Sequence, residues 1–315
     1  MTGKNATETL LADEAGIAKA VQLLKSGGIV AVPTETVYGL AARADSDEAV
    51  ARIYEAKGRP SFNPLIVHVG SVQQAQKIAR FDERAKQLAD RFWPGPLTMV
   101  LPLLASSRLA GAVTAGLPTI ALRQPAHPAM QAVLAASELP LAAPSANQSG
   151  GVSPTEAKHA ASSLGEAVDL ILDGGRCDRG LESTIVALRD DGSWQLLRHG
   201  PIAEAELIRL LGKPVDVVTA EIEAPGQLAN HYSPGKPIRL EGRTAQADEF
   251  HIGFGDVAGD VNLSASGDLL EAASRLYSAL HQAAGSDKLK VAVAPIPKED
   301  LGAAINDRLK RAAAT

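Results

Sequence analysis

The chain has 315 residues, enough for two domains, and its 45% hydrophobic and 21% charged residues exclude disordered and fibrous classes. With 31 basic and 36 acidic residues the net charge is −5, which argues against a polyanion binder that relies on overall basicity, although a local basic cleft stays possible. The single cysteine, Cys177, excludes a disulfide framework, and the polar N-terminus and the lack of a long apolar run predict a soluble, cytoplasmic protein without a membrane contact.

The first two-thirds of the chain alternate between helical and strand patterns. Helices are predicted at 14–26, 47–57, 71–92, 126–137, 155–164 and 203–211, and strands at 28–32, 65–69, 97–103, 119–123, 139–143, 168–173, 183–188 and 194–198. The helix over 71–92 ends at the two prolines of 93–96, which a helix cannot cross. Strands interleaved with helices predict an α/β sheet covered on its faces, and the close succession of strands after residue 168 predicts a mixed sheet.

The pattern lapses between about 212 and 237, where prolines and glycines without periodicity predict an extended connector. From 238 onward strand patterns alternate with helices at 268–284 and 299–313, which predicts a small second α/β unit. We therefore predict a domain over 1–211, a linker over 212–237 and a C-terminal domain over 238–315.

Several familiar motifs are missing from the sequence. There is no G-x-x-x-x-G-K-[ST] loop, no G-x-G-x-x-G opening a helix, no H-E-x-x-H and no G-x-S-x-G. No Ser-His-Asp or Cys-His spacing indicates a protein nucleophile. Any bound phosphate must therefore be held by separate side chains and backbone amides.

Four clusters of polar residues lie at the ends of predicted strands and helices. Residues 33–40 (PTETVYGL) fit a Pro-initiated turn better than a site when taken alone. Lys57 and Arg59 follow a predicted helix, where a favourable dipole interaction and a cationic clamp are equally open. Residues 143–155 fit either a plain loop or a nest of donors for phosphate oxygens. The fourth cluster contains Ser183 and Arg198.

Two further residues lie in predicted strands. His68 lies within an apolar strand, and such a histidine is more often a satisfied core residue than a ligand-binding one. Arg123 closes an apolar strand and points to the crevice where α/β sheets bind ligands. If Arg59, Arg123 and Arg198 share one cleft, they form a local anion site on an acidic protein. The residues alone thus predict a binder or transferase for a polyphosphate and a small carboxylate, acting by positioning and charge neutralisation.

The motifs in their order carry a family resemblance. PTETVYGL, KGRPSFNPLIVHV, WPGPLT, PLAAPSANQSGGVSPT, LESTIV and LLRHGPI resemble the successive motifs of the YrdC-like domain from about residue 14 to 202. PGQLANHYSP and residues 238–315 resemble the linker and C-terminal domain of the two-domain threonylcarbamoyl-AMP synthases, with a departure from the family pattern at 227–230. The resemblance implies a YrdC-like twisted mixed sheet flanked by helices and a small C-terminal α/β (Rossmann-like) domain.

The same resemblance implies an activity: L-threonine, bicarbonate and ATP give L-threonylcarbamoyl-adenylate and pyrophosphate, the first step of threonylcarbamoyladenosine formation in tRNA. By similarity, the threonine site consists of Thr36, His68, Arg123, Ala143 and Ser183. By similarity, the ATP site consists of Arg59, Asn63, Thr119, Ser145, Ser153, Arg198 and Tyr232, and the catalytic cations are Lys57 and Arg59. Mg²⁺ is expected to be held mainly by the ATP phosphates, with no metal site made by the protein. Tyr232 is expected to close over the nucleotide, and the product is expected to pass to a tRNA threonylcarbamoyl-transferase complex.

The sequence leaves two other functions to be considered. A carbamoyl-transferring relative would also use a YrdC-like domain, but the single cysteine excludes the zinc fingers of those enzymes. A non-catalytic RNA-binding module is disfavoured by the acidic composition and by only eleven aromatic residues (five Phe, four Tyr and two Trp), although a tRNA contact limited to a cleft is compatible with the sequence.

Overall fold

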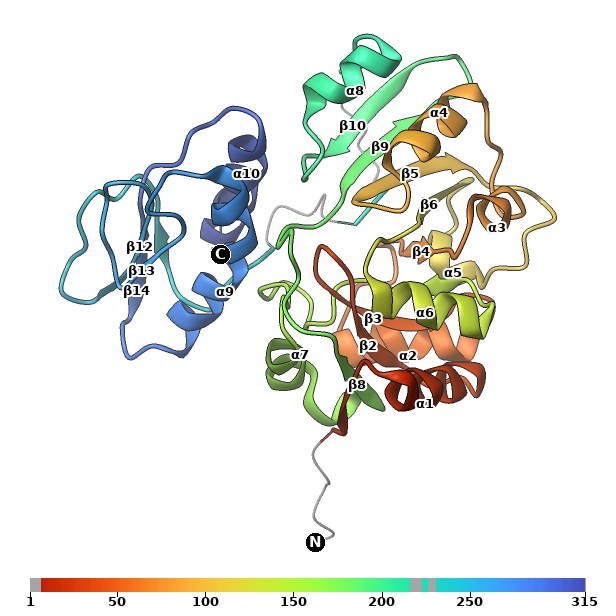
Figure 1. The fold of residues 1–315 in the computed structure, drawn as a ribbon, viewed down its shortest axis with the longest axis horizontal. Coiled ribbons are helices and arrows are strands. Elements are labelled where there is room, and N and C mark those ends of the chain that lie inside the picture. The colour runs from red at the N-terminus through yellow and green to blue at the C-terminus, as the bar shows by residue number, and fades with distance from the viewer. Residues whose placement is uncertain (1–6, 216–222, 226–230, 315) are drawn as a thin grey trace, which may run out of the picture.

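Two sheets organise the molecule, as the computed structural model shows for residues 7–215, 223–225 and 231–314 (Figure 1). The larger sheet has ten strands in the order β1-β8-β2-β3-β7-β4-β6-β5-β9-β10. Its strands are β1 Thr9–Leu11, β2 Val30–Pro33, β3 Tyr38–Arg43, β4 Ile66–His68, β5 Leu97–Pro102, β6 Thr119–Arg123, β7 Leu141–Ala142, β8 Leu170–Asp173, β9 Thr184–Leu188 and β10 Trp194–Arg198. Parallel and antiparallel neighbours both occur, which confirms the predicted mixed sheet.

Eight α-helices accompany this sheet in the described part of the chain. They are α1 Glu14–Lys25, α2 Asp47–Lys57, α3 Val72–Gln76, α4 Glu83–Phe92, α5 Gly111–Thr114, α6 Pro128–Ser137, α7 Ala157–Leu164 and α8 Glu204–Leu211. Local capping explains their bounds. For example, the Ser46 side chain accepts a hydrogen bond from the Ala49 amide at the start of α2, and Gly58 ends that helix in the left-handed conformation. This end of α2 places Lys57 on the helix and Arg59 in the loop after it.

The helices cover the two faces of the sheet unequally. Apolar residues of α2, α4 and α7 join the main core on one face, whereas α1 and α6 cover the other face over β8, β2, β3 and β7. Over β4, β6, β5 and β9 that second face carries a small apolar cluster of Ile66, Val100, Ala121, Ile185 and Ala187. No helix of the described residues contributes to this cluster, and connector residue Ala224 packs on it instead. The site described below lies where the helical cover ends.

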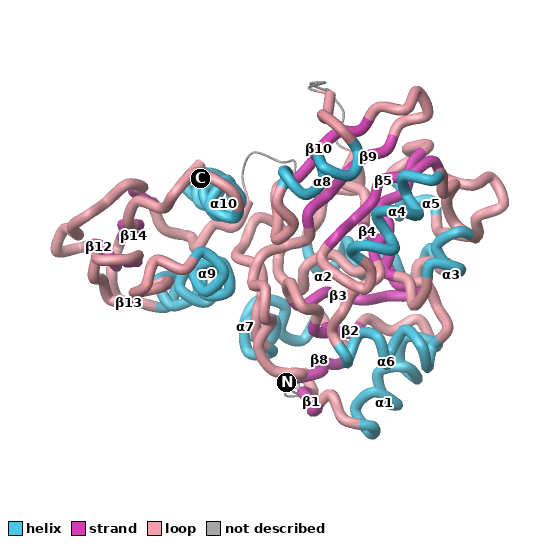
Figure 2. The backbone as a smooth tube through the Cα atoms, turned by 45° about the horizontal axis from the view of Figure 1, so that its top comes forward, coloured by secondary structure: helices cyan, strands magenta, loops and turns pink. Residues whose placement is uncertain are grey.

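The smaller sheet has four parallel strands in the order β11-β14-β12-β13. Its elements are β11 Ile238–Arg239, β12 Glu249–Gly253, β13 Val261–Asn262, β14 Lys290–Val293, α9 Leu269–Gly285 and α10 Leu301–Ala313. Figures 1 and 2 both show α9 and α10 between this sheet and the first domain. The parallel strands with their helices confirm a small second α/β unit, and its helices form the contact with the first.

Five sequence-based expectations for secondary structure were wrong or incomplete. Of residues 33–40 only 34–37 form a turn, because Pro33 ends β2 and residues 38–40 begin β3. The predicted continuous helix over 71–92 is two helices, α3 and α4. Between them the Arg80 amide donates to the Pro102 carbonyl (2.9 Å), so this segment pairs with the chain after β5. The strands β1 and β3 and the short α5 were missed. For β3 the reason is that it is rich in glycine and alanine and becomes a strand only through its neighbours β2 and β7. No helix among the described residues has the length and apolarity to cross a membrane.

Candidate active site

The turn between β2 and β3 is held by hydroxyl groups. The Thr34 hydroxyl donates to the Val37 carbonyl (2.7 Å) and accepts from the amide of Thr36 (3.2 Å), so this turn is closed by its own side chain. The Thr34 and Thr36 hydroxyls lie 2.8 Å apart, and both residues are buried. Residues 34–37 therefore form a turn capped by hydroxyl groups, as the sequence predicted. The same turn forms part of the wall of a pocket.

Strand register brings His68 and Arg123 together. β4 and β6 are parallel neighbours in which His68 lies opposite Arg123 and Ile66 opposite Ala121. Because side chains alternate along a strand, His68 and Arg123 share the face that carries Ile66 and Ala121, away from the helices α2 and α4. Both side chains are buried at the edge of the helical cover.

The guanidinium of Arg123 is held from three sides. Its Nη2 donates to the Glu35 carboxylate (2.6 Å), its Nη1 to the Thr36 hydroxyl (2.9 Å) and its Nε to the Gly95 carbonyl (3.2 Å). Burial by itself would raise the pKa of Glu35, but the neighbouring Arg123 outweighs it, so the carboxylate stays charged. Arginine has five N–H donors, and these three contacts leave two of them, one on each terminal nitrogen, for a further acceptor.

Ser183 and Arg198 lie beside each other in the wall of the pocket. Arg198 donates through Nε to the Ser183 carbonyl (3.0 Å) and through Nη2 to its hydroxyl (3.1 Å). The Ser183 hydroxyl also lies 2.7 Å from that of Thr98. A third nitrogen of Arg198 donates to the carbonyl of Pro225 (3.2 Å), which ties the connector to the sheet. Burial lowers the pKa of Arg198, so this cation is held in a setting that favours an anionic partner.

Lys57 and Arg59 have different surroundings. The Lys57 ammonium is buried and donates to the carbonyls of Ser145 (2.6 Å) and Asn147, so it holds the loop that follows β7. Arg59 donates to the carbonyls of Asn63 (3.1 Å) and Pro64 (2.8 Å), and burial lowers its pKa to about 10. Arg59 lines the pocket and Lys57 does not.

The connector forms the remaining wall through Pro225, His231 and Tyr232. Tyr232 is fully buried and packs in the apolar core of the C-terminal domain, with its ring 5.4 Å from that of Tyr277. The Tyr232 hydroxyl and the Nδ1 atom of His231 are buried without a hydrogen-bond partner. Buried polar atoms of this kind normally have a partner, so both atoms are suited to a bound ligand. The predicted departure at 227–230 lies outside the described residues.

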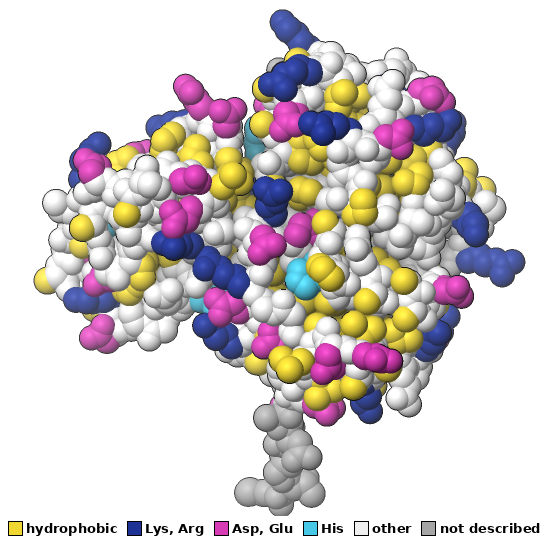
Figure 3. Space-filling model, viewed as in Figure 1, with side chains coloured by type: hydrophobic (Ala, Val, Ile, Leu, Met, Phe, Trp, Pro, Cys, Tyr) yellow, Lys and Arg dark blue, Asp and Glu magenta, His cyan; other side chains and the backbone are white. Residues whose placement is uncertain are grey.

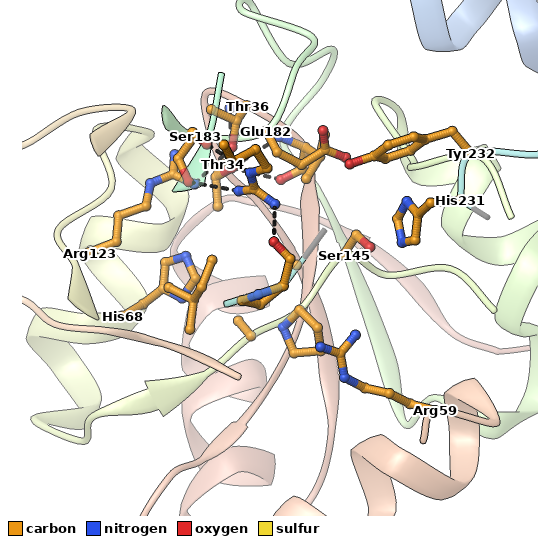
Figure 4. Close-up of a pocket in the computed structure, with 17 residues that line it drawn as sticks. Thr34, Thr36, Arg59, His68, Arg123, Ser145, Glu182, Ser183, His231 and Tyr232 are labelled. Atoms are coloured by element: carbon orange, nitrogen blue, oxygen red, sulfur yellow. Dashed lines mark hydrogen bonds between the residues drawn. The ribbon is translucent and has the colours of Figure 1, made fainter. Parts of the chain in front are cut away.

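Most of the predicted site residues meet at one cavity, which Figure 4 shows in close-up. Its walls include Thr36, Arg59, His68, Arg123, Ala143, Ser145, Ser183, Arg198 and Tyr232. In Figure 4 His68 and Arg123 lie on one side, and His231, Tyr232 and Arg59 on the other, with Ser145 nearer the latter. The predicted residues that do not line it are Lys57, Asn63, Thr119 and Ser153.

The size of the cavity differs from the expectation of a pocket that fits a nucleotide beside an amino acid. Its volume is about 50 Å³, room for a few waters, because the connector packs against the uncovered face of the sheet. Pro225 and Tyr232 form part of the cavity wall, and a nucleotide could enter only if this part of the wall moved. The convergence of the three arginines was predicted correctly, whereas the open pocket was not.

Two neutral imidazoles face this cavity. Burial, assisted by nearby cations, lowers the pKa of His68 and of His231 to about 3 each. The Nδ1 atom of His68, like that of His231, is buried without a hydrogen-bond partner. Both side chains therefore offer an uncharged donor or acceptor to a ligand.

Sequence reasoning missed several lining residues: Thr34, Gly39, Pro144, Glu182, Pro225 and His231. Glu182 is buried between Arg308 and Ser153, whose positions in the chain are far from it. Its place directly before Ser183 in a cluster already singled out was a usable signal. Gly39 had no sequence signal, yet a Cβ there would lie 3.2 Å from the Cβ of Ala143 and would crowd this wall.

A mixed α/β sheet thus gathers three arginines at the end that its helices leave uncovered. A family model described as telomere recombination, covering Sua5, YciO and YrdC proteins, matches residues 22–200, and the model of the threonylcarbamoyl-AMP synthase C-terminal domain matches residues 202–314. The chain belongs to the threonylcarbamoyl-AMP synthase family.

Individual relatives agree with this assignment. The threonylcarbamoyl-AMP synthase of Pyrococcus abyssi is 37% identical over 93% of this chain and 92% of its own length. That of Bacillus subtilis is 44% identical over 74% of this chain and 69% of its own. The crystal structure of P. abyssi Sua5 complexed with L-threonine superposes with a TM-score of 0.87 and 33% identity, covering 98% of this chain and 96% of that one. The similarity thus extends over both domains.

Proposed function

We propose that the cavity between the large sheet and the connector is where threonine and ATP react. As a member of its family the chain is an enzyme, a transferase that forms threonylcarbamoyl-AMP for tRNA modification from L-threonine, bicarbonate and ATP. The observation that carries the assignment of the site is the meeting of Arg59, Arg123 and Arg198 at one cavity of an otherwise acidic protein. We further propose that 1–211 is the catalytic domain, 212–237 the linker and 238–315 the C-terminal domain.

The threonine side of the site is the side of His68 and Arg123. The two spare N–H groups of Arg123 bind the α-carboxylate, and the neutral His68, Thr36 and Ser183 meet the hydroxyl and the amine. The backbone at Ala143 supplies the remaining polar group. This arrangement directs the amine toward the cations on the other side of the cavity.

The nucleotide side is the side of Arg59, Ser145, Arg198 and Tyr232. Asn63 and Ser153 are buried behind that wall, and the Oδ1 atom of Asn63 has no hydrogen-bond partner, so it is available when the connector shifts. Thr119 begins β6, at the end of the strand opposite Arg123. Its place fits the base or ribose end of a nucleotide better than the triphosphate.

The chemistry needs no nucleophile from the protein. Threonine's amine and bicarbonate give a carbamate and water, and the carbamate oxygen attacks the α-phosphorus while pyrophosphate leaves. Arg59 and Arg198 offset the charge that develops on the pyrophosphate, and Lys57 acts through the Ser145 carbonyl that it holds. Mg²⁺ enters on the phosphates, and the described residues contain no cluster of three His, Cys, Asp or Glu side chains that could hold it. Tyr232 excludes water from the adenylate once it closes over the nucleotide.

The product is passed to a tRNA threonylcarbamoyl-transferase complex, and the protein acts in the cytoplasm. A broad tRNA-binding surface is not part of this proposal. On the face shown in Figure 3 basic and acidic side chains are interspersed rather than gathered into one basic field. On that face a direct tRNA contact would thus be confined to a small area.

The test is an incubation with ATP, Mg²⁺, labelled bicarbonate and one amino acid at a time, followed by mass analysis of the adenylate and assay of pyrophosphate. We expect release that depends on threonine, modest release with serine, which lacks only a methyl group, and little with valine, which leaves the groups prepared for the hydroxyl unpaired. Transfer of a carbamoyl group to another acceptor, or salt-sensitive tRNA binding without ATP turnover, would contradict the proposal.

A further inference from the structure

A buried carboxylate lies in the wall of the proposed nucleotide site. Of the described residues that line the cavity, Glu182 is the only acidic one, and its side chain is 8% exposed. One carboxylate oxygen accepts from the Ser153 hydroxyl (2.5 Å), and the other accepts from the Tyr277 hydroxyl (2.7 Å) and from Nε of Arg308 (3.1 Å). A negative charge at this place opposes a triphosphate unless something neutralises it.

The neutralising group comes from the C-terminal domain. Arg308 on α10 is fully buried, and its guanidinium carbon lies 5.6 Å from the centre of the Tyr232 ring. Burial by itself would raise the pKa of Glu182, but Arg308 and Arg198 outweigh it and lower that pKa to about 2. Both members of the Glu182–Arg308 pair are therefore charged, and the pair joins the two domains behind the cavity.

Arg198 is the second cation near Glu182, and it is also a proposed ligand of the phosphates. Without Arg308, the carboxylate would have Arg198 as its nearest cation and would compete with the phosphates for it. With Arg308 in place, Glu182 is paired with a guanidinium, which also donates through Nη1 to Asp307 (2.9 Å) on its own helix. The same guanidinium lies over the ring of Tyr232, so it also supports the connector residue that faces the nucleotide.

We infer that Arg308 is a positioning residue of the C-terminal domain for the nucleotide site, because it neutralises Glu182 and so leaves Arg198 to the phosphates of ATP. This inference rests on the proposed place of ATP. It gives the C-terminal domain a part in substrate binding: the domain supplies a counter-charge from behind the wall.

The test compares Arg308→Met, Glu182→Gln and the double variant in the full-length protein, with Lys310→Met as the matched control. Lys310 is an exposed cation on the same helix. Dissociation constants are measured by calorimetry for an α,β-methylene analogue of ATP and for L-threonine. We expect Arg308→Met to weaken binding of the analogue by about tenfold or more, and that of threonine by less than about twofold.

The double variant distinguishes two roles of Arg308: neutralising the charge of Glu182, and merely attaching the C-terminal domain to the first domain. The double variant has no unpaired carboxylate and should bind the analogue within about threefold of the wild type, and Glu182→Gln alone should bind it at least as tightly as the wild type. If the double variant is as weak as Arg308→Met, or if Glu182→Gln loses affinity, the inference is wrong. Glu182→Gln decides the matter even if Arg308→Met does not fold.

A further variant separates failure of this inference from failure of the proposed nucleotide site. Arg59→Gln removes a lining cation that does not contact Glu182. If it binds the analogue as the wild type does, the proposed place of ATP is itself wrong. If it is weakened while Arg308→Met is not, only the role of Arg308 is rejected.

Discussion

The two sides of the candidate site differ in what holds them in place. On the threonine side, Arg123 is held by Glu35, Thr36 and Gly95, all within the first domain and all on or beside the large sheet. On the nucleotide side, Arg198 is tied to the connector through Pro225, and Tyr232 is embedded in the core of the C-terminal domain. The first side is formed by one sheet, and the second requires three parts of the chain to be docked together.

The threonine side of the candidate site is thus preorganised by one sheet, whereas the nucleotide side is assembled from separate parts of the chain. A carboxylate site built on strand ends keeps its geometry when the rest of the protein moves. A nucleotide at the proposed site would require the connector to move, because the cavity has a volume of only about 50 Å³. Changes on the first side should therefore alter threonine binding alone, whereas changes on the second should alter ATP binding through docking as well as contact.

The largest effect is expected for Arg123→Ala. Loss of the guanidinium should raise the KM for threonine more than about 100-fold while ATP still binds, because truncating a buried, hydrogen-bonded charge typically costs 2–5 kcal/mol, roughly 30- to several-thousand-fold. Steady-state kinetics and calorimetry with the ATP analogue check this. Since the substitution leaves Glu35 unpaired, Glu35→Gln/Arg123→Met serves as a second variant without a buried orphan charge. Retained threonine affinity in both would remove Arg123 from its assigned role and break the comparison.

A smaller effect, on ATP alone, is expected for Tyr232. Tyr232→Ala should weaken ATP binding by about tenfold, and Tyr232→Phe by about threefold, because phenylalanine keeps the ring beside Tyr277 and loses only the unpartnered hydroxyl. The measurements are ATP affinity and the ratio of adenylate formed to pyrophosphate released. Unchanged affinity and yield in both variants would show that Tyr232 does not close over the nucleotide.

Lys57→Met tests whether that cation acts through the loop that it holds. The partly buried carbonyl of Ser145 and the buried carbonyl of Asn147 would lose their donor. We therefore expect a loss of about 2 kcal/mol in the free energy of unfolding and about a fivefold rise in the KM for ATP. Urea denaturation and kinetics give both values. Lys25→Met is the matched control, since exposed Lys25 donates to a single helix-end carbonyl, and it should cost less than about 0.5 kcal/mol. A large loss of kcat at unchanged stability would instead make Lys57 a catalytic residue.

The smallest effect concerns the pH dependence of stability on the threonine side. Because the pKa of His68 falls from 6.5 to about 3 in the folded protein, the unfolded chain binds a proton between these values and the native one does not. Stability should thus fall as the pH drops below the unfolded value, with His68 contributing about 1.5 kcal/mol between roughly pH 7 and pH 5.3.

Urea denaturation at both pH values, for the wild type and His68→Gln, measures this share. The variant should lose less stability on acidification than the wild type. His199→Gln replaces an exposed histidine and is the matched control. An equal loss in the wild type and in His68→Gln would mean that His68 is not a neutral, buried group.

Local signals account for the elements that were predicted well. The helix over 47–57 and the strands over 119–123 and 194–198 have the bounds that the sequence indicated, because caps, periodicity and chain breaks act within a few residues. The strand β3 was missed because its glycine and alanines have little preference of their own. The long helix over 71–92 was predicted as one piece because nothing local marks where Arg80 pairs with the chain after β5.

For the site, the sequence by itself determined which chemical groups are present: guanidinium, hydroxyl and imidazole groups at element ends, in an order that the family shares. Tertiary structure decided their partners. Glu35 meets Arg123 across 88 residues and Glu182 meets Arg308 across 126 residues, contacts that no local pattern encodes. Only folding sets burial and distance, and these decide which charges are neutralised inside the protein and which stay available to a ligand.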